Sequence, residues 1–387
     1  MEGPPIANGV VTIEASRIAG VGTASTGTVV DLGHVAMLPA LVNAHTHFEL
    51  SYLHGRVPPS TNFGEWVRTV MAIRREHADP AHPDIVDAAR AAIADARAAG
   101  TGLVGDISNT LATTSLLSDA GMAAQVFHEL TGFTEPDPLA RVREARARAD
   151  AARSGDVRVS VAPHAPYSVS PALFRAVRED IDAHHAAVST VHLGESPEEV
   201  EWLRRGTGAL RQVLEALGRW PADWEPPDAS AVGYLSELGF LDSRVLAVHG
   251  VQFDGDDLSR LRALGVTLVS CPRSNVYVGV GSPPLEVFYA MDVEVAFGTD
   301  SLASVATVSL FDELAEARRI APRVPARRLL ESATRIGARA LGFGDDFGTL
   351  EPGKRAAVIA VQVPAGVKDV EEFLVSGVPS SAVSWVG

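Results

Sequence analysis

The chain of 387 residues has little of several residue types, and each shortage excludes a class of protein. Its one cysteine, Cys271, excludes an internal disulfide framework and a cysteine-rich zinc module. No apolar run approaches the roughly 18–20 residues that cross a membrane, and Met1–Val10 lacks the features of a signal peptide, so we expect a cytoplasmic protein. With 33 Lys+Arg against 48 Asp+Glu, the net charge of −15 disfavours nucleic acid and anionic membranes as partners.

What the chain does have is an alternation of strand-like and helix-like segments. The predicted strands are Val35–His47, Thr101–Ile107, Ala123–Leu130, Val157–Pro166, Val188–Glu195, Val245–Phe253, Val266–Pro272 and Glu294–Asp300. Helical stretches lie between them, for example Ile85–Ala99, Pro138–Arg153, Pro171–His184, Pro197–Leu217 and Leu310–Ile320. This pattern predicts an α/β fold, a (β/α)₈ TIM barrel. A doubly wound open sheet competes, but no glycine-rich turn follows the first strand.

The two ends of the chain resemble each other and differ from the middle. Val10–Ile13, Arg17–Val21, Val29–Leu32 and Val358–Val361 are predicted as short strands. Since chain ends often lie close together, we expect residues 1–37 and 346–387 to form one small β-sandwich domain and residues 38–345 to form the barrel. The segment 51–83 is expected to be a long loop over the C-terminal mouth of the barrel, where active sites form.

Polar residues end several of the predicted strands, where a barrel interior normally holds Val, Ile or Leu. His45 and His47 stand two apart on a strand and so face the same side. His192 and Asp300 would complete a donor set that suits zinc or a similar ion and leaves room for a water molecule. Taken alone, a His-x-His pair is more often two core histidines than a metal site, but the shared position of these residues at strand ends favours a metal site.

The ordered set of His45, His47, His192, His249 and Asp300 resembles the amidohydrolase superfamily, in particular its nucleobase and nucleoside deaminases. Further strings are similar to the family of aminodeoxyfutalosine deaminases, which serve menaquinone biosynthesis; they are His47–Ser51, Phe63–Trp66, Pro163–Ser170, Cys271–Asn275 and Gly348–Val358. The resemblance covers nearly the whole chain. It implies a metal-dependent aminohydrolase that removes the amino group of an adenine nucleoside, aminodeoxyfutalosine, and releases ammonia.

The resemblance also implies roles for individual residues. His45, His47, His192 and Asp300 would hold the metal, and Asp300 would accept a proton from the attacking water. His249 would steer that water, while Glu195 would protonate the ring nitrogen next to the reacting carbon. A structural alternative for Glu195 is an acid at the start of the helix that follows it. We expect one divalent ion, zinc or alternatively iron, because no lysine precedes Lys354 that could bridge two metals after carboxylation.

The substrate contacts that the resemblance implies are less specific. Glu49 would accept the ribose hydroxyls, Trp66 would cover the purine or the benzoate, and His164 would contact the substrate. A substrate carboxylate would pair with an arginine, since arginine binds carboxylates in a bidentate manner. Arg273 is preferred because it stands just past the seventh predicted strand, and Ser274 next to it is also expected to bind the substrate; the other arginine candidates are Arg56, Arg68 and Arg74. Three structural alternatives remain: Glu49 could be a solvated or salt-bridged loop residue, Trp66 could pack within the loop, and His164 could contact Tyr167 or Ser168.

Rival functions use the same donor set. They include deamination of methylthioadenosine and adenosylhomocysteine, of guanine or of cytosine, and hydrolysis of a triazine. A binding protein that kept the barrel but lost catalysis is a further alternative, although such a protein should also have lost metal ligands. A small-molecule substrate is expected in each enzymatic case, and a homodimer is the expected assembly.

Overall fold

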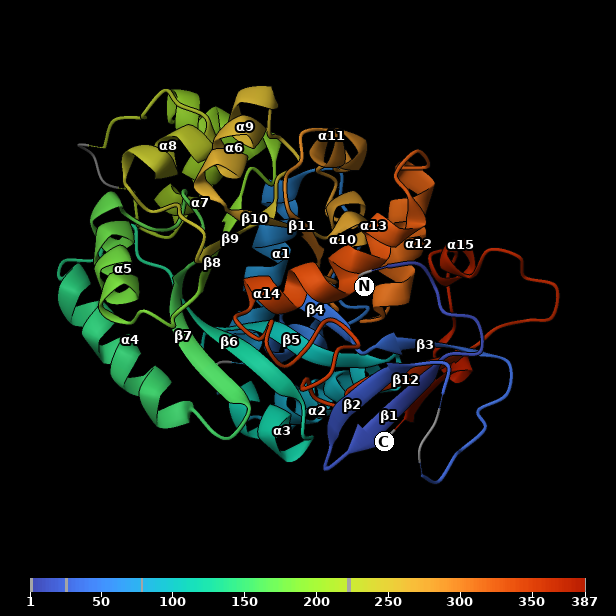
Figure 1. The fold of residues 1–387 in the computed structure, drawn as a ribbon. Helices are drawn as coiled ribbons and strands as arrows, with labels where there is room; N and C mark the ends of the chain where they lie inside the picture. Colours follow the sequence, from blue (N-terminus) through green and yellow to red (C-terminus); the bar gives the residue numbers. More distant parts are fainter. Residues whose placement is uncertain (1–2, 25–26, 78, 221–223, 387) are drawn as a thin grey trace.

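The computed structural model describes residues 3–24, 27–77, 79–220 and 224–386, so Met1, Glu2 and Gly387 of the predicted terminal domain lie outside it. Two four-stranded parallel sheets form its centre (Figure 1). In spatial order they are β4 (Leu41–Thr46), β5 (Thr101–Ser108), β6 (Ala123–Leu130) and β7 (Val157–Pro163), then β8 (Ser189–Leu193), β9 (Val245–His249), β10 (Thr267–Ser270) and β11 (Val295–Phe297).

Two seams join these sheets into a ring. At one seam the His192 backbone N–H donates to the His164 carbonyl at 2.9 Å, and at the other the Asp300 N–H donates to the His45 carbonyl at 3.0 Å. The predicted (β/α)₈ barrel is therefore confirmed. Both seams are made by residues at the C-terminal ends of strands, so barrel closure and side-chain convergence occur at the same place.

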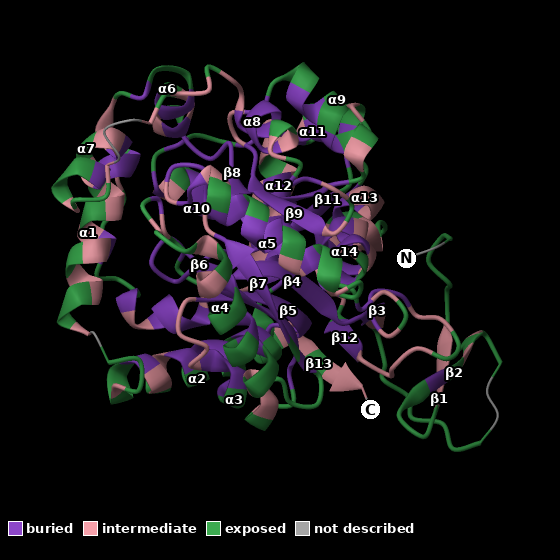
Figure 2. Ribbon diagram, turned by 90° about the vertical axis from the view of Figure 1, so that its left-hand side faces the viewer, coloured by how far each residue is buried: buried purple, intermediate pink, exposed green. Residues whose placement is uncertain are grey.

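Helices cover the outside of the ring, and Figure 2 shows buried strands inside helices whose outer faces are exposed. They are α1 (Phe63–Glu76), α2 (Pro83–Ala98), α3 (Thr113–Asp119), α4 (Pro138–Ala152), α5 (Pro171–Ala183), α6 (Pro197–Arg205), α7 (Ala209–Ala216), α8 (Ala231–Glu237), α9 (Gly255–Leu264), α10 (Pro272–Tyr277), α11 (Leu285–Ala290), α12 (Leu310–Ile320), α13 (Ala326–Glu331), α14 (Gly337–Ala340) and α15 (Val370–Leu374). Local sequence sets several starts: Asp137, Ser170 and Ser196 each accept a backbone N–H of the helix that follows, with proline at its first position.

Four details of the sequence interpretation are wrong. The predicted strand Val35–His47 is two strands, Val35–Pro39 and Leu41–Thr46, and only the second belongs to the barrel. Val29–Leu32 is not a strand. The segment expected as a long loop contains α1 and the end of a short 3₁₀ helix, Phe48–Leu53. Asn62 caps the start of α1 by accepting the Glu65 N–H. The helical stretch from Pro197 is divided into α6 and α7 at Gly206, whose φ of 64° ends the first helix.

The chain ends build two small antiparallel sheets beside the barrel. One pairs β1 (Val10–Glu14) with β2 (Arg17–Gly22); the other orders β13 (Val383–Val386), β12 (Val358–Gln362) and β3 (Val35–Pro39). The Ile18 N–H donates to the Lys354 carbonyl at 2.8 Å, so the two termini contact each other as expected. The boundaries at residues 37 and 346 stay a prediction.

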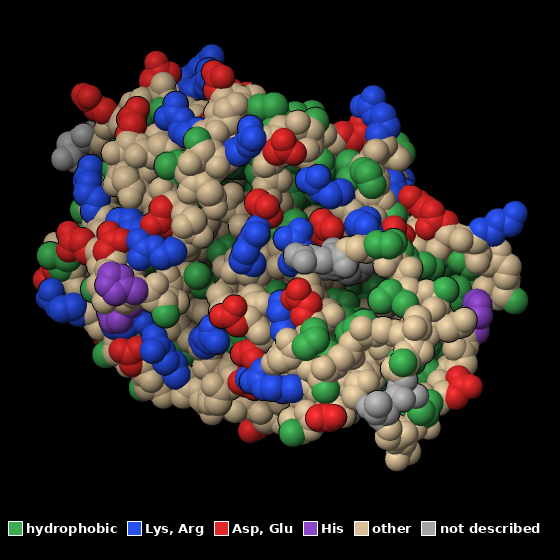
Figure 3. All heavy atoms as spheres, viewed as in Figure 1, with side chains coloured by type: hydrophobic (Ala, Val, Ile, Leu, Met, Phe, Trp, Pro, Cys, Tyr) green, Lys and Arg blue, Asp and Glu red, His purple; other side chains and the backbone are tan. Residues whose placement is uncertain are grey.

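The surface carries both signs of charge, and Figure 3 shows them interspersed over one face. Exposed large apolar side chains are frequent near the N-terminus, where they include Ile6, Val29 and Val30. Within the described residues, no helix is both long and apolar enough to cross a membrane.

Candidate active site

The seam between β4 and β11 brings three predicted metal ligands together. His45 Nε2 lies 3.2 Å from His47 Nε2, and the Asp300 Oδ1 atom lies 3.9 Å and 3.5 Å from these two nitrogens. His45 is fully buried and Asp300 is nearly so. His45 lies on β4 and His47 directly follows this strand, so the two imidazoles, two residues apart in an extended segment, lie on the same side.

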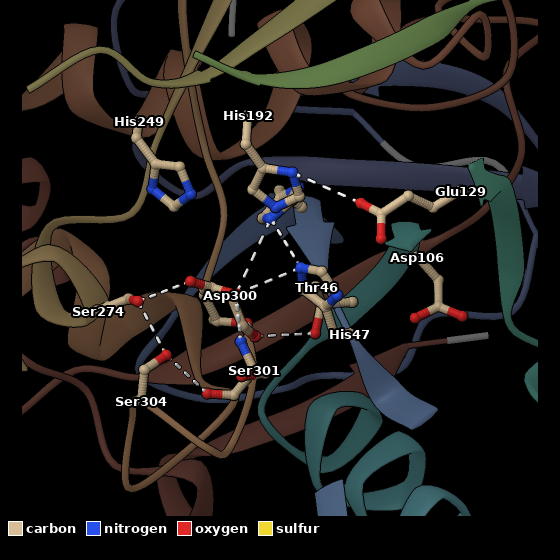
Figure 4. A network of polar contacts seen from close by, with 12 residues as sticks. Thr46, His47, Asp106, Glu129, His192, His249, Ser274, Asp300, Ser301 and Ser304 are labelled. Atoms are coloured by element: carbon tan, nitrogen blue, oxygen red, sulfur yellow. Dashed lines mark hydrogen bonds and ion pairs between the residues drawn. The ribbon is translucent and has the colours of Figure 1, made fainter. Parts of the chain in front are cut away.

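His192 approaches the same place from β8. Its ring centroid lies 4.9 Å from that of His45 and 5.5 Å from that of His47. Its Nδ1 is 3.1 Å from the His164 carbonyl oxygen, which fixes the ring and leaves Nε2 for another partner. Figure 4 shows His192 between His249 and Glu129. The ligand atoms of His45, His192 and His249, and those of His45, His47 and Asp300, lie within 4.8 Å of one another.

The chemistry of this donor set fits a divalent metal. Burial, together with the charges of neighbouring histidines, lowers the pKa of His45 and of His47 well below the usual value, so both rings are neutral near pH 7. Burial likewise lowers the pKa of His192. Neutral imidazole nitrogens and one carboxylate are ligands that zinc and iron accept.

Asp300 is held in a strained backbone conformation. Its φ is 61°, in the left-handed region that few residues other than glycine adopt. Asp300 Oδ2 accepts a hydrogen bond from Ser274 Oγ at 2.6 Å, and Oδ1 accepts one from the Ser301 N–H at 2.8 Å. Ser274 Oγ also contacts Ser304 Oγ at 2.8 Å, so a small hydroxyl network orients the carboxylate (Figure 4).

His249 and Glu195 face each other across the site. The His249 Nε2 atom lies 3.7 Å from Glu195 Oε1 and has no hydrogen-bond partner among the described residues. Asn275 Nδ2 contacts His249 Nδ1 at 3.0 Å; since an amide nitrogen donates, the neutral ring carries its proton on Nε2. His249 also has a positive φ, 80°. The two strand-end residues with strained backbones therefore both belong to this site.

The carboxyl group of Glu195 is protonated near pH 7 and can therefore donate a proton. Burial, followed by the charges of Asp300 and Glu199, raises the pKa of Glu195 well above its usual value. Glu199 positions it: the two oxygens of the Glu199 carboxylate accept the Gly194 and Glu195 N–H groups at 3.1 and 3.0 Å. The turn after β8 thus presents a buried, protonated carboxyl group next to His249.

Glu49 lies at the neighbouring edge of the mouth, among donors from the loop after β5. Its carboxylate accepts hydrogen bonds from Ser108 Oγ, the Asn109 N–H, the Thr110 N–H and Thr110 Oγ1, at 2.7, 2.9, 3.2 and 2.9 Å. A pocket of about 150 Å³ opens beside it and is also lined by Arg74. The contact of Glu49 with ribose stays a prediction.

The other predicted substrate residues lie around the mouth. His164 Nδ1 contacts Ser168 Oγ at 2.6 Å, and its ring centroid lies 4.8 Å from that of His192. Trp66 is half-buried on α1 and stacks on Phe63. Arg273, on α10, uses Nη1 for its contacts with Thr307, Asp312 and Glu313. Cys271, in contrast, is a buried free thiol.

Sequence reasoning missed Glu129 and Asp106, which also end strands at this mouth. Glu129 Oε2 accepts a hydrogen bond from Asn109 Nδ2 at 2.8 Å, and Oε1 lies 3.5 Å from His192 Nδ1. Asp106 accepts from the Phe48 N–H at 2.9 Å and from Thr113 Oγ1 at 2.6 Å. A rule that the sequence analysis applied to other strands, a polar residue at the strand end, would have found both.

Comparisons with known proteins agree with this geometry. The amidohydrolase family model matches residues 36–381, so the chain belongs to the amidohydrolase family. An aminodeoxyfutalosine deaminase of Deinococcus radiodurans is 32% identical over 80% of this chain and 74% of its own length. A 5-methylthioadenosine/S-adenosylhomocysteine deaminase of Moorella thermoacetica is 28% identical over 94% and 83%.

Solved structures of other proteins have a similar fold. An adenosine deaminase from Xanthomonas campestris with bound zinc has a TM-score of 0.81 and 26% identity, covering 98% of this chain and 86% of its own. The aminofutalosine deaminase of Helicobacter pylori in complex with methylthio-coformycin has a TM-score of 0.83 at 24% identity, over 96% and 90%. The predicted superfamily and class of enzyme, a hydrolytic deaminase acting on C–N bonds, are confirmed.

Proposed function

We propose that this protein hydrolytically deaminates an adenine nucleoside, and that the nucleoside is aminodeoxyfutalosine. The observation that carries the proposal is the convergence of three neutral histidines and Asp300 opposite a protonated Glu195. The Deinococcus relative supports the choice of nucleoside. The product would be the deaminated nucleoside plus ammonia, in menaquinone biosynthesis.

The position of each residue suggests its role in the reaction. A divalent ion held by His45, His47, His192 and Asp300, zinc or alternatively iron, would lower the pKa of a water molecule towards about 7 and so supply a nucleophile. We propose one such ion per chain. The Asp300 carboxylate, oriented by Ser274, then accepts the proton of the attacking water.

The purine would be activated from the opposite side. Glu195 is protonated and donates its proton to N1 as the neighbouring carbon, C6, is attacked. His249 Nε2–H, held by Asn275, hydrogen-bonds the oxygen that adds to C6. The proton that Asp300 has accepted passes to the amino group, and the C6–N bond breaks to release ammonia. As the C6=O bond forms, the proton of the added hydroxyl returns to Glu195, which restores both residues to their starting states.

The benzoate carboxylate of the substrate would pair with Arg273. The side-chain contacts of Arg273 in the described structure use Nη1, so Nε and Nη2 can form a bidentate pair with a ligand. His164 and Trp66 would contact the nucleoside, and so would Ser274 and Glu49. We also propose that the enzyme is cytoplasmic and forms a homodimer.

A second candidate, deamination of methylthioadenosine or adenosylhomocysteine, is favoured by the Moorella relative, whose match extends over 94% of this chain. It uses the same donor set and differs in what is attached to the ribose. The distinction therefore depends on the mouth of the barrel and not on the metal site.

The test is ammonia release by the purified protein from aminodeoxyfutalosine, methylthioadenosine, adenosylhomocysteine and adenosine, supplied separately. We expect the highest kcat/KM for aminodeoxyfutalosine, complete loss of activity after chelation, and recovery on adding zinc. A higher kcat/KM for methylthioadenosine would transfer the proposal to the second candidate. Release of ammonia from none of the four by metal-loaded protein would contradict both.

A further inference from the structure

Two buried carboxylates lie at the edge of the mouth formed by β5 and β6, and their surroundings differ. Both oxygens of Glu49 accept hydrogen bonds from the 108–110 turn, and Oε1 also lies 3.8 Å from Arg74 Nη2. Glu129 accepts one side-chain hydrogen bond, from Asn109 to Oε2 at 2.8 Å. Its Oε1 has no hydrogen bond among the described residues and lies 3.5 Å from Nδ1 of the neutral His192 ring.

Glu129 also points toward the histidines. Its ligand atom and those of His164 and His192 lie within 4.8 Å of one another. Figure 4 shows Glu129 on the opposite side of His192 from His249. If the reacting C6 edge of a purine meets His249 and Glu195, the sugar on N9 lies across the ring system from them, toward Glu129.

We infer that Glu129, rather than Glu49, binds the vicinal hydroxyls of the substrate ribose. Each carboxylate oxygen of Glu129 can accept a hydrogen bond, and a vicinal diol offers two donors, so the groups are complementary. Glu129 is 7% exposed, and a buried acceptor discriminates strongly against a ligand that lacks the matching donor. The inference rests on the proposed function and extends it to selection of ribonucleosides.

A purely structural role for Glu129 would be to orient His192, since ligand histidines usually donate their second N–H to a fixed acceptor. The His164 carbonyl already fills that role at 3.1 Å. The two roles differ in what they do to metal content, and this difference makes them separable.

The experiment compares adenosine with 2′,3′-dideoxyadenosine as substrates of wild-type enzyme, Glu129→Gln and the matched control Glu144→Gln, which lies exposed on α4. We expect wild type and control to prefer adenosine by about 30-fold or more in kcat/KM, and Glu129→Gln to lower that preference at least about tenfold through its effect on adenosine. Metal content per chain should stay unchanged. Glu129→Asp, which keeps the carboxylate on a shorter chain, should restore part of the preference.

Three results would overturn the inference. An equal loss on both nucleosides together with a loss of metal would assign Glu129 to orienting His192. If a folded Glu129→Gln enzyme kept the preference for adenosine over dideoxyadenosine and Glu49→Gln lost it, Glu49 would be the residue that binds the ribose hydroxyls. Failure of the wild type on both nucleosides and on the four substrates above would remove the proposed function itself, and the inference with it.

Discussion

The two edges of the barrel mouth differ in what surrounds their buried polar groups. At the seam of β4 and β11, groups of the same kind converge: His45 Nε2 and His47 Nε2 lie 3.2 Å apart, and a carboxylate faces both. At the edge of β5 and β6, complementary groups converge, as where Glu49 accepts donors of the 108–110 turn. Like groups held together indicate a missing partner, whereas complementary groups satisfy each other.

Among the substitutions proposed, Asp300→Asn at the seam should lower activity the most. The amide keeps the size of the side chain but cannot accept the proton of the water and is a weaker ligand. We expect kcat to fall about 10³-fold or more, with reduced metal content measured by elemental analysis. Asp87→Asn, on the exposed face of α2, is the control and should change neither. A variant with full activity would exclude Asp300 from catalysis.

Gly298→Ala tests how tightly the seam is packed. A Cβ at this position would lie 2.7 Å from both the Cβ and the carbonyl oxygen of His45, and backbone cannot move aside cheaply. We expect a loss of about 1–3 kcal/mol in unfolding free energy, measured by urea denaturation, and a large loss of activity. Gly255→Ala, where a Cβ meets nothing within 4 Å, should be near neutral. Equal stabilities of the two variants would contradict this packing.

Asn275→Ala should affect the chemical step more than binding. Without the amide, His249 loses the contact that fixes its tautomer and orientation. We expect kcat to fall about 10–100-fold while KM and metal content change little. Steady-state kinetics and elemental analysis measure these quantities. A matching rise in KM, with kcat retained, would indicate that His249 binds substrate instead.

Arg273→Ala should change substrate preference. Removal of the guanidinium should lower kcat/KM about tenfold or more for the carboxylated aminodeoxyfutalosine but little for adenosine. The measurement is the ratio of the two kcat/KM values. Arg74→Ala is the comparison, because Arg74 lies beside Glu49 and Asn109. A selective loss in Arg74→Ala alone would move the carboxylate-binding role to the other edge of the mouth.

The smallest expected effect is a pH dependence of the unfolding free energy, and it comes from Asp106 on β5. Burial raises the pKa of Asp106 to about 7 in the folded protein, from an ordinary value of 3.8. Such a group stabilises the fold at low pH, and this contribution is lost as pH rises from near 4 through about 7. The wild type should therefore lose about 1 kcal/mol or more relative to Asp106→Asn between pH 5 and pH 8, measured by urea denaturation. A parallel pH dependence of the two proteins would contradict the raised pKa.

The sequence predicted the barrel well because each strand is short, β-branched and bounded by helical stretches, which is a local signal. It failed at Val29–Leu32, where the apolar residues are exposed and pair with no strand. It also failed at α1, whose start depends on the Asn62 cap. Glu129 was missed although it stands near the end of a predicted strand, because that rule was not applied to this strand. Its contacts with Asn109 and His192 could not be read from the sequence, since Asn109 and His192 are distant from it along the chain.

The Asp300–His45 bond that closes the barrel joins positions 255 residues apart by numbering. Four of the eight barrel strands precede His192, and the last must be in place before Asp300 can face the histidines. A ribosome-bound chain therefore has no complete donor set until nearly four-fifths of its length has been made. The complete metal site can therefore form only after β11, the last barrel strand, and Asp300 have been synthesised.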